Sequence, residues 1–210
     1  MAGNRMQVVV LGAAGQLGRA IVHTFVERGH SVRALARRMP APALDSSAQM
    51  VIADARNKAD VRQALAGCDV VVNAIGAGTL RRNEVESTTT AVAVAASQEA
   101  RVERYFAMSA GMVALDWILF KYVLRPLIFR HILAEHCRVE EIVKGSSLAW
   151  TIVRPSKLTN GAPKGYVATL QLQPKSFSTT RADVASFIAD EIDARAYVRQ
   201  AVFVTSRVAR

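Results

Sequence analysis

The chain has few of the residues that would indicate a metal centre or a disulfide-bonded scaffold. It contains two cysteines among 210 residues, Cys68 and Cys137, and neither belongs to a metal-ligand spacing. We therefore expect no metal site, no disulfide framework and a reducing compartment. The first residues, MAGNRMQVVV, lead directly into a predicted strand without room for a signal peptide, which predicts a cytoplasmic protein.

A long uninterrupted apolar run is also missing from the sequence. The most apolar later stretch, Trp117 to Leu133, is interrupted by Lys121, Arg125, Pro126 and Arg130, which would make a membrane-spanning helix costly. We therefore predict no integral membrane segment. The roles that remain for this stretch are a lid, a subunit contact or a segment lying on a membrane surface.

Acidic residues are in the minority, at 17 against 27 basic residues, and the net charge is +10. The basic residues are scattered along the chain, without a run in which basic and aromatic residues are interleaved. This distribution favours solvated surface charge and anionic small-molecule ligands over nucleic acid. The sequence shows no repeat or low-complexity segment, and its length suits one α/β domain.

The most informative stretch is Gln7 to Gly18, QVVVLGAAGQLG. Its first part, Val8 to Leu11, is a β-branched and aliphatic run typical of a parallel strand buried on both faces. From Gln16 onward, apolar residues recur at helical spacing. A strand that turns into a helix through glycines leaves free N–H groups at the positive end of the helix dipole, where a diphosphate binds. The predicted contacts are Gly12, Ala14, Gly15, Gln16, Leu17 and Gly18.

The glycine spacing, GxxGxxG, differs from the commonest dinucleotide fingerprint, GxGxxG, so a glycine-rich turn without a ligand is the alternative. The next predicted strand, Ser31 to Ala36, is followed at once by Arg37 and Arg38. An acid at this point binds the 2′-hydroxyl of NAD, whereas an arginine accepts the 2′-phosphate of NADP. The sequence therefore predicts NADP(H), with NAD(H) as the second choice. The alternative for the arginines is an ordinary surface position before a proline-rich loop.

Two further strand ends are predicted to reach the same site. Asp54 follows the short strand Met50 to Ala53, where its carboxylate either accepts from the adenine amino group or caps the helix that begins near Lys58. The stretch Asp69 to Gly78 contains a buried strand and then small residues, which allow a ribose and phosphates to approach closely. The predicted contacts at these two ends are Asp54, Ala55, Ala74, Ile75 and Gly76.

Strands and helices continue to alternate, which predicts an α/β fold, a Rossmann-type doubly wound parallel sheet. We predict a single domain over residues 1–210, with residues 110–133 and 156–177 forming the substrate-side loops. Thr180 is the expected N-cap of a helix from Arg181 to Ile192. The other predicted elements are helices over Thr88 to Ala100 and Leu133 to Lys144 and strands over Val102 to Met108, Leu148 to Val153 and Ala201 to Thr205.

Motifs that together span nearly the whole chain point to one family. They are VVVLGAAGQLGRAIV (8–22), ALARR (34–38), VIADARN (51–57), VVVNAIG (70–76), AMSAG (107–111), SSLAWTIVRP (146–155) and TTRADVASFI (179–188). With these motifs the chain resembles the atypical short-chain dehydrogenases whose NAD(P)-binding domains are like those of the NmrA regulator, flavin reductase and biliverdin-IXβ reductase. The resemblance implies that NADP(H) binds to Gly12, Gly15, Gly18, Arg37, Asp54 and Gly76.

Better-known short-chain dehydrogenases use a Tyr-x-x-x-Lys pair, in which the lysine lowers the pKa of the tyrosine and the tyrosine passes a proton to the substrate. This chain lacks the pair. Alignment of its SSLAW segment on the family puts Ile132 at the tyrosine position and His136 at the lysine position. Carbonyl reduction assisted by that tyrosine is therefore disfavoured.

The segment EHCRVEEIVKGSSLAW is similar to that of biliverdin-IXβ and flavin reductase, which carry a histidine at the position of His136. Those enzymes transfer a hydride to a planar conjugated acceptor, which can take its proton from water. The resemblance implies that Ser109 hydrogen-bonds the nicotinamide or the acceptor, and that Pro155 with Ser156 holds the carboxamide through backbone groups. His136 shapes the pocket or donates a proton; the alternative is an ordinary half-exposed helical histidine.

The first functional hypothesis is an NADPH-dependent reductase of a flavin, a quinone or a similar planar aromatic acceptor, active as a monomer or homodimer. Arg37, the missing Tyr-Lys pair and the apolar segment Met112 to Ile132, which could cover a flat substrate, motivate it. One alternative is a non-catalytic NADP(H)-binding sensor or regulator of the NmrA type. The other is a reductase or epimerase of a biosynthetic ketone, which needs a proton donor that the sequence does not identify.

Overall fold

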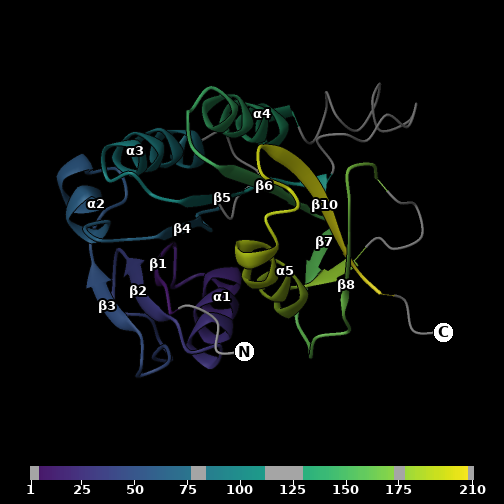
Figure 1. Cartoon of the computed structure of the whole chain (residues 1–210), viewed down its shortest axis with the longest axis horizontal. Coiled ribbons are helices and arrows are strands. Elements are labelled where there is room, and N and C mark those ends of the chain that lie inside the picture. Colours follow the sequence, from purple (N-terminus) through teal and green to yellow (C-terminus); the bar gives the residue numbers. More distant parts are fainter. Residues whose placement is uncertain (1–4, 77–83, 112–129, 173–177, 208–210) are drawn as a thin grey trace.

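A computed structural model of the chain describes residues 5–76, 84–111, 130–172 and 178–207. Within these residues the main sheet has eight strands: β1 (Gln7–Leu11), β2 (Ser31–Ala36), β3 (Gln49–Ile52), β4 (Val70–Asn73), β5 (Arg104–Met108), β6 (Trp150–Pro155), β8 (Tyr166–Thr169) and β10 (Gln200–Ser206). Their order is β3-β2-β1-β4-β5-β6-β10-β8. The sheet forms the middle layer of the molecule, with helices on both faces (Figure 1).

The helices of the described chain divide between these two faces. They are α1 (Gln16–Glu27), α2 (Lys58–Ala64), α3 (Val85–Glu99), α4 (Arg130–Lys144) and α5 (Arg181–Ala194). α1 and α5 pack against each other on one face, whereas α2, α3 and α4 follow one another across the other face (Figure 1). The sheet therefore needs apolar side chains on both of its surfaces.

β1 meets this requirement at the centre of the molecule. Val8 and Val10 lie in the core cluster that contains Phe25 of α1 and residues of α5. Val9 and Leu11 lie in the other core cluster, with residues of α2 and α3. All four strand residues are fully buried. Because successive side chains of a strand point to opposite faces, an uninterrupted apolar run is what a strand covered on both faces requires.

The strand order positions the functional site. β1 pairs in parallel with β2 on one side and with β4 on the other. The chain runs outward from β1 through β2 to β3, then crosses back to β4 and continues in the opposite direction. At such a switch point, the loops that leave the carboxyl ends of the two central strands diverge and open a crevice between them.

The predicted fold class is confirmed, with one difference at the edge of the sheet. β8 pairs antiparallel with β10, so the sheet is mostly but not wholly parallel. β7 (Lys157–Thr159) and β9 (Ser178–Thr180) form a separate parallel pair. The sequence analysis placed residues 156–177 in a loop, so β7 and β8 were missed. Residues 173–177 lie outside the described residues.

The helices α1, α2 and α5 begin where they were predicted, but two other helix starts differ. α3 begins at Val85, before the predicted Thr88, and α4 begins at Arg130, before the predicted Leu133. Residues 112–129 lie outside the described residues, so the roles predicted for most of the apolar stretch and for most of loop 110–133 stay predictions. Within the described part of the chain, no helix combines the length and the apolar character that crossing a bilayer requires.

Candidate functional site

A crevice of about 270 Å³ opens at the carboxyl ends of β1, β2, β3 and β4. The start of α3 closes one side of it. This is the switch point at which ligands of open α/β sheets bind, and most of the predicted contacts from these four strand ends are brought together there. The crevice is lined by Gly12, Ala14, Gly15, Leu35, Ala36, Arg37, Asp54, Ala55, Arg56, Ala74, Ile75, Gly76, Val85 and Thr89.

The start of α1 forms the first wall of the crevice. Its N-cap, Gly15, has an extended backbone with φ −71° and ψ 161°, and no side chain caps the helix. The first turn also contains no acid. The N–H groups of Gln16 and Leu17 have no acceptor within the helix, because the first turn of a helix leaves its donors unpaired. Such groups, together with the positive end of the helix dipole, are the kind of donors to which an anion can bind.

Gly12 and Gly18 are required by the packing of the turn itself. Gly12 has φ +78°, and a Cβ on it would lie 3.0 Å from the backbone nitrogen of Ile75. A Cβ on Gly18 would lie 2.3 Å from the carbonyl oxygen of Gly12. The N–H groups of Gly12 and Ala13 both donate to the carbonyl of Leu35 at 3.1 Å, which fixes the turn against β2. The glycines thus allow a strand, a turn and a helix to approach more closely than side chains would permit.

The loop after β4 forms the second wall, and Asn73 holds it in place. Its Nδ2 donates to Thr90 Oγ1 at 3.0 Å and to the hydroxyl of Tyr105 at 3.3 Å. Its Oδ1 accepts from the N–H of Ile75 at 3.3 Å. Burial raises the pKa of Tyr105, so this hydroxyl stays protonated. The buried amide therefore fixes the path by which Gly76 reaches the crevice.

The outer end of the crevice carries two arginines. Arg37, directly after β2, is exposed and lines the crevice as predicted, whereas Arg38 is exposed and is not among the lining residues. Arg56, which the sequence analysis did not single out, forms a bidentate pair with Asp54. Arg56 Nε lies 3.0 Å from Oδ1 and 3.1 Å from Oδ2, and its Nη2 lies 2.5 Å from Oδ2. The side-chain hydrogen bond from Arg56 is the main cause that lowers the pKa of Asp54 to about 2.

One of the two predicted roles of Asp54 is wrong. The N-cap of α2 is Asn57, whose Oδ1 accepts from the N–H of Ala59 at 2.9 Å. Asp54 instead accepts from the N–H of Arg56 at 3.0 Å, within the turn that precedes the helix. Asn57, which the sequence analysis did not consider as a cap, directly precedes the helix, and its side chain therefore reaches the first turn.

Farther along the same sheet edge, Ser109 ends β5 inside a buried polar cluster. Its Oγ donates to Glu140 Oε1 at 2.8 Å, and Arg154 and Lys144 also donate to that carboxylate. Burial would raise the pKa of Glu140, but these hydrogen bonds outweigh it and hold the pKa at about 2. Because the proton of Ser109 is donated to an ionised carboxylate, this hydroxyl can only accept from a ligand.

His136 of α4 lies beside an acid of α3. Its Nδ1 is 3.3 Å from Glu86 Oε2, and the two side chains are 17% and 11% exposed. Glu86 also borders the crevice, because its Oε1 would be 3.8 Å from a Cβ placed on Gly76. The predicted histidine is therefore positioned at the Gly76 end of the crevice, next to a carboxylate that sequence analysis missed.

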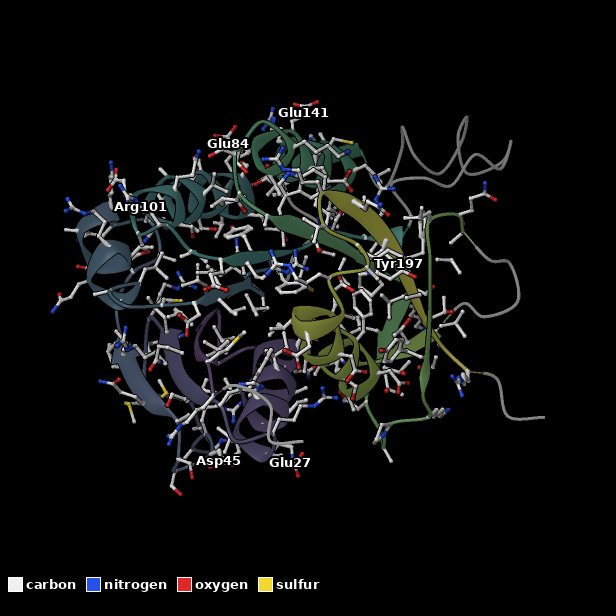
Figure 2. All side chains as sticks on the ribbon, in the orientation of Figure 1. Glu27, Asp45, Glu84, Arg101, Glu141 and Tyr197 are labelled. Atoms are coloured by element: carbon white, nitrogen blue, oxygen red, sulfur yellow. The ribbon has the colours of Figure 1, made fainter. Side chains whose placement is uncertain are left out.

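α4 also completes the start of α3. Glu135 Oε1 accepts from the backbone N–H of Ser87 at 2.8 Å and from its hydroxyl at 2.9 Å. Arg138 Nη1 lies 3.5 Å from Glu84, which Figure 2 shows close to α4, and 3.7 Å from Glu135. These contacts fix the two helices relative to each other, and so they fix the histidine–glutamate pair that the helices carry.

Pro155 and Ser156 lie at the end of β6. The N–H of Ser156 donates to the carbonyl of Val204 at 3.3 Å, and Pro155 has no N–H to donate. The carbonyl oxygen of Pro155 would be 3.1 Å from a Cβ on Gly111, so the chain after β5 passes close to it. These two residues can therefore offer a ligand their carbonyl oxygens and the hydroxyl of Ser156, but no backbone donor.

The structure thus separates the predicted residues into two groups. One group lines the crevice, whereas Ser109, Pro155 and Ser156 follow β5 and β6 farther along the same edge of the sheet, and His136 lies on α4 beside Glu86. Gln16, Leu17, Gly18 and Arg38 are not among the lining residues either. Arg56, Glu86 and Glu140 were missed. Glu140 had a detectable signal, since it lies one helical turn after His136 on the same face of α4.

The chain matches the model of the NAD(P)H-binding family over residues 12–195. It belongs to that family. The coenzyme is therefore NAD(P)H, and the chain is an oxidoreductase of the NAD(P)H-binding kind. The described residues fit this coenzyme, because the uncapped start of α1 can accept the diphosphate and the arginine after β2 can accept a phosphate on the ribose.

Relatives of known sequence or structure agree with this assignment. The chain is 28% identical over 196 residues to an uncharacterised sugar epimerase of Bacillus subtilis, covering 90% of this chain and 88% of the relative. A short-chain dehydrogenase/reductase of Veillonella parvula, solved in complex with NADP, is 19% identical with a TM-score of 0.78, covering 96% and 94% of the two chains. A Streptococcus pneumoniae protein provisionally named an NADH-flavin reductase is 20% identical with a TM-score of 0.80, covering 96% and 100%. These two structures show a shared fold.

Proposed function

We propose that the protein is an NADPH-dependent reductase that transfers a hydride to a flavin, a quinone or a similar planar conjugated acceptor. The observation that carries this proposal is the commitment of the Ser109 hydroxyl to Glu140. A simple ketone requires a donor at its oxygen when the hydride arrives, and Ser109 has no proton left to give. A planar conjugated acceptor spreads the developing charge and takes its proton later.

The described residues would divide the work between binding and orientation. The turn from Gly12 to Gly18 holds the diphosphate and Arg37 holds the 2′-phosphate. Ser109 Oγ and the carbonyl of Pro155 accept hydrogen bonds from the carboxamide nitrogen, which fixes the ring that faces the acceptor. When bound, the reduced coenzyme supplies the hydride, and the protein supplies its direction.

His136 is the proposed source of the proton. Its Nδ1 faces Glu86, which leaves Nε2 as the nitrogen that exchanges a proton with the acceptor. The carboxylate of Glu86, 3.3 Å from Nδ1, favours this orientation of the ring. A planar acceptor that has received a hydride takes this proton at a nitrogen or an oxygen, and solvent then restores it on the imidazole.

A panel of NADPH oxidation assays tests the proposal. We expect turnover with at least one of FMN, a simple quinone and biliverdin, and lower turnover with NADH. NADPH binding should be measured on the same sample by calorimetry. Bound NADPH without turnover of any acceptor would contradict the proposal and would leave the sensor or regulator role.

Reduction or epimerisation of a ketone is the second candidate, and the His136–Glu86 pair favours it. This pair can protonate an oxygen without the missing tyrosine. The name of the Bacillus subtilis relative points to the same chemistry. His136→Gln separates the two candidates: it should abolish ketone reduction, but it should only slow the reduction of a planar acceptor, which can take its proton from water.

A further inference from the structure

Arg56 and Asp54 form an ion pair at the outer end of the crevice. Membership in the NAD(P)H-binding family does not by itself give this pair a role. Both residues line the crevice. The side chain of Arg56 is 54% exposed and that of Asp54 is 36% exposed. Because two atoms of the guanidinium contact both oxygens of the carboxylate, the plane of the guanidinium is fixed while its outer side stays open to solvent.

The pair lies beside Arg37. β2 and β3 are parallel neighbours, so their carboxyl ends meet at one edge of the sheet. The N–H of Ala53 donates to the carbonyl of Ala36 at 3.0 Å, which brings the residue before Asp54 next to the residue before Arg37. Arg37 also contributes electrostatically to the lowered pKa of Asp54. Two arginines from adjacent strand ends therefore face one end of the crevice.

The hydrogen bonds of Asp54 to Arg56 compete with a role as a receptor for adenine. Oδ1 accepts from the backbone N–H of Arg56 and from its Nε, and Oδ2 accepts from Nε and Nη2. A carboxylate has about four lone-pair sites, and three N–H donors of Arg56 engage it, with the single Nε–H shared between the two oxygens. A bond to the adenine amino group would require Asp54 to release the arginine.

We propose that Arg56 binds the 2′-phosphate of NADP(H) together with Arg37, and that Asp54 positions Arg56 instead of contacting adenine. The inference rests on NADP(H) as the coenzyme and is independent of the acceptor. A planar, fixed guanidinium suits a phosphate because it can present two parallel N–H donors. The carboxylate of Asp54 has a second effect, since its charge repels the phosphate and weakens the binding that Arg56 supports.

Calorimetric titration with NADP⁺, NAD⁺ and adenosine 2′,5′-bisphosphate tests the role of Arg56. Arg56→Ala should weaken binding of NADP⁺ and of the bisphosphate about tenfold, because a charge-assisted hydrogen bond is lost. Binding of NAD⁺, which lacks the 2′-phosphate, should change less than about twofold. Arg62→Ala is the matched control, since Arg62 carries the same charge on α2 and pairs with Glu99 away from the crevice.

Two substitutions of Asp54 separate its two possible roles. Asparagine keeps a carbonyl that can hold Arg56 and removes the charge, so NADP⁺ should bind about threefold more tightly while NAD⁺ is little changed. Asp54→Ala removes this carbonyl as well, and the proposal expects NAD⁺ binding to Asp54→Ala to be little changed. Loss of an adenine receptor would instead weaken the binding of both coenzymes equally, and that result would overturn the proposal. So would an unchanged NADP⁺ to NAD⁺ ratio in Arg56→Ala.

The titrations also distinguish this inference from the proposed function. If the unaltered protein binds NADP⁺ and the variants behave as expected, a failure to find an acceptor affects only the proposed function. If none of the three ligands binds to the unaltered protein, both the coenzyme preference and the role of Arg56 are overturned.

Discussion

The starts of α1 and α5 solve the same physical problem in opposite ways. Every helix begins with N–H groups that have no acceptor within the helix. At α5, Thr180 Oγ1 accepts from the N–H of Asp183 at 3.0 Å. Asp183 is fully buried in the first turn, where it accepts from Ser206 Oγ and from the N–H of Lys164 at 3.0 Å. At α1, the protein provides neither a capping side chain nor an acid.

This difference indicates which helix start serves the protein and which serves a ligand. The two helices pack against each other on one face of the sheet (Figure 1), so their environment in the fold is similar. α5 is completed by the chain's own side chains and contributes to stability. In the binding mode that we propose, α1 leaves its donors to the diphosphate of the coenzyme, whose binding would then stabilise the helix start.

Gly18→Ala, in the first turn of α1, should have the largest effect on both stability and coenzyme binding. The new Cβ would lie 2.3 Å from the carbonyl oxygen of Gly12, which is backbone and cannot rotate away. We expect a loss of about 3 kcal/mol in the free energy of unfolding and no measurable coenzyme binding. Urea denaturation and calorimetry measure the two effects. Gly145→Ala at the end of α4 is the control, and a similar loss there would remove the explanation by close approach.

Gly15→Asp should make the start of α1 resemble the start of α5. Gly15 has an extended backbone that aspartate can adopt, so the new carboxylate can cap the first turn and repel the diphosphate. We expect coenzyme affinity to fall about 100-fold, while the free energy of unfolding without coenzyme changes by only about 0.3 kcal/mol. Gly15→Ala adds the Cβ without the charge. Equal losses of affinity in both variants would attribute the effect to steric exclusion.

Acid should weaken the polar cluster around Glu140, which Ser109, Arg154 and Lys144 complete. Like the start of α5, this cluster is satisfied by the protein's own side chains. Glu140 has a folded-state pKa of about 2, against 4.5 for a free side chain. Its contribution is therefore fully present above about pH 4.5 and is lost as the pH falls towards 2, on the order of 2 kcal/mol. Urea denaturation between pH 6 and pH 3 measures the loss. Glu140→Gln should flatten this part of the profile, and an unchanged slope would contradict the assignment.

Thr180→Ala should produce the smallest effect. It tests the comparison at the start of α5 instead of at the start of α1. Loss of the capping oxygen should lower the free energy of unfolding by about 1 kcal/mol. Affinity for the coenzyme should stay within about twofold, because the start of α5 does not line the crevice. Thr180→Ser keeps the oxygen and is the matched control. A marked loss of coenzyme affinity in Thr180→Ala would show that the two helix starts are coupled.

Much of the fold and of the coenzyme crevice could be predicted because the signals are local. The range predicted for β2, Ser31 to Ala36, coincides with the strand, and the predicted capping of α5 by Thr180 is confirmed. Both depend on residues within one turn or one strand. The start of α3 was missed because Ser87 is capped by Glu135, a residue of another helix. The antiparallel β8 was missed because its pairing depends on β10, far away in the sequence.

The sequence by itself determined where the apolar runs, the glycine turn and the arginine after β2 would lie, because hydrophobic periodicity and backbone conformation act over a few neighbouring residues. Only the tertiary structure decided which polar groups are already satisfied. Ser109 is left as an acceptor for a ligand because its hydroxyl donates to Glu140 of α4, and His136 lies beside Glu86 of α3. Such pairings join distant parts of the chain, and a hydroxyl or an imidazole takes its chemical role from the partner that the fold brings to it.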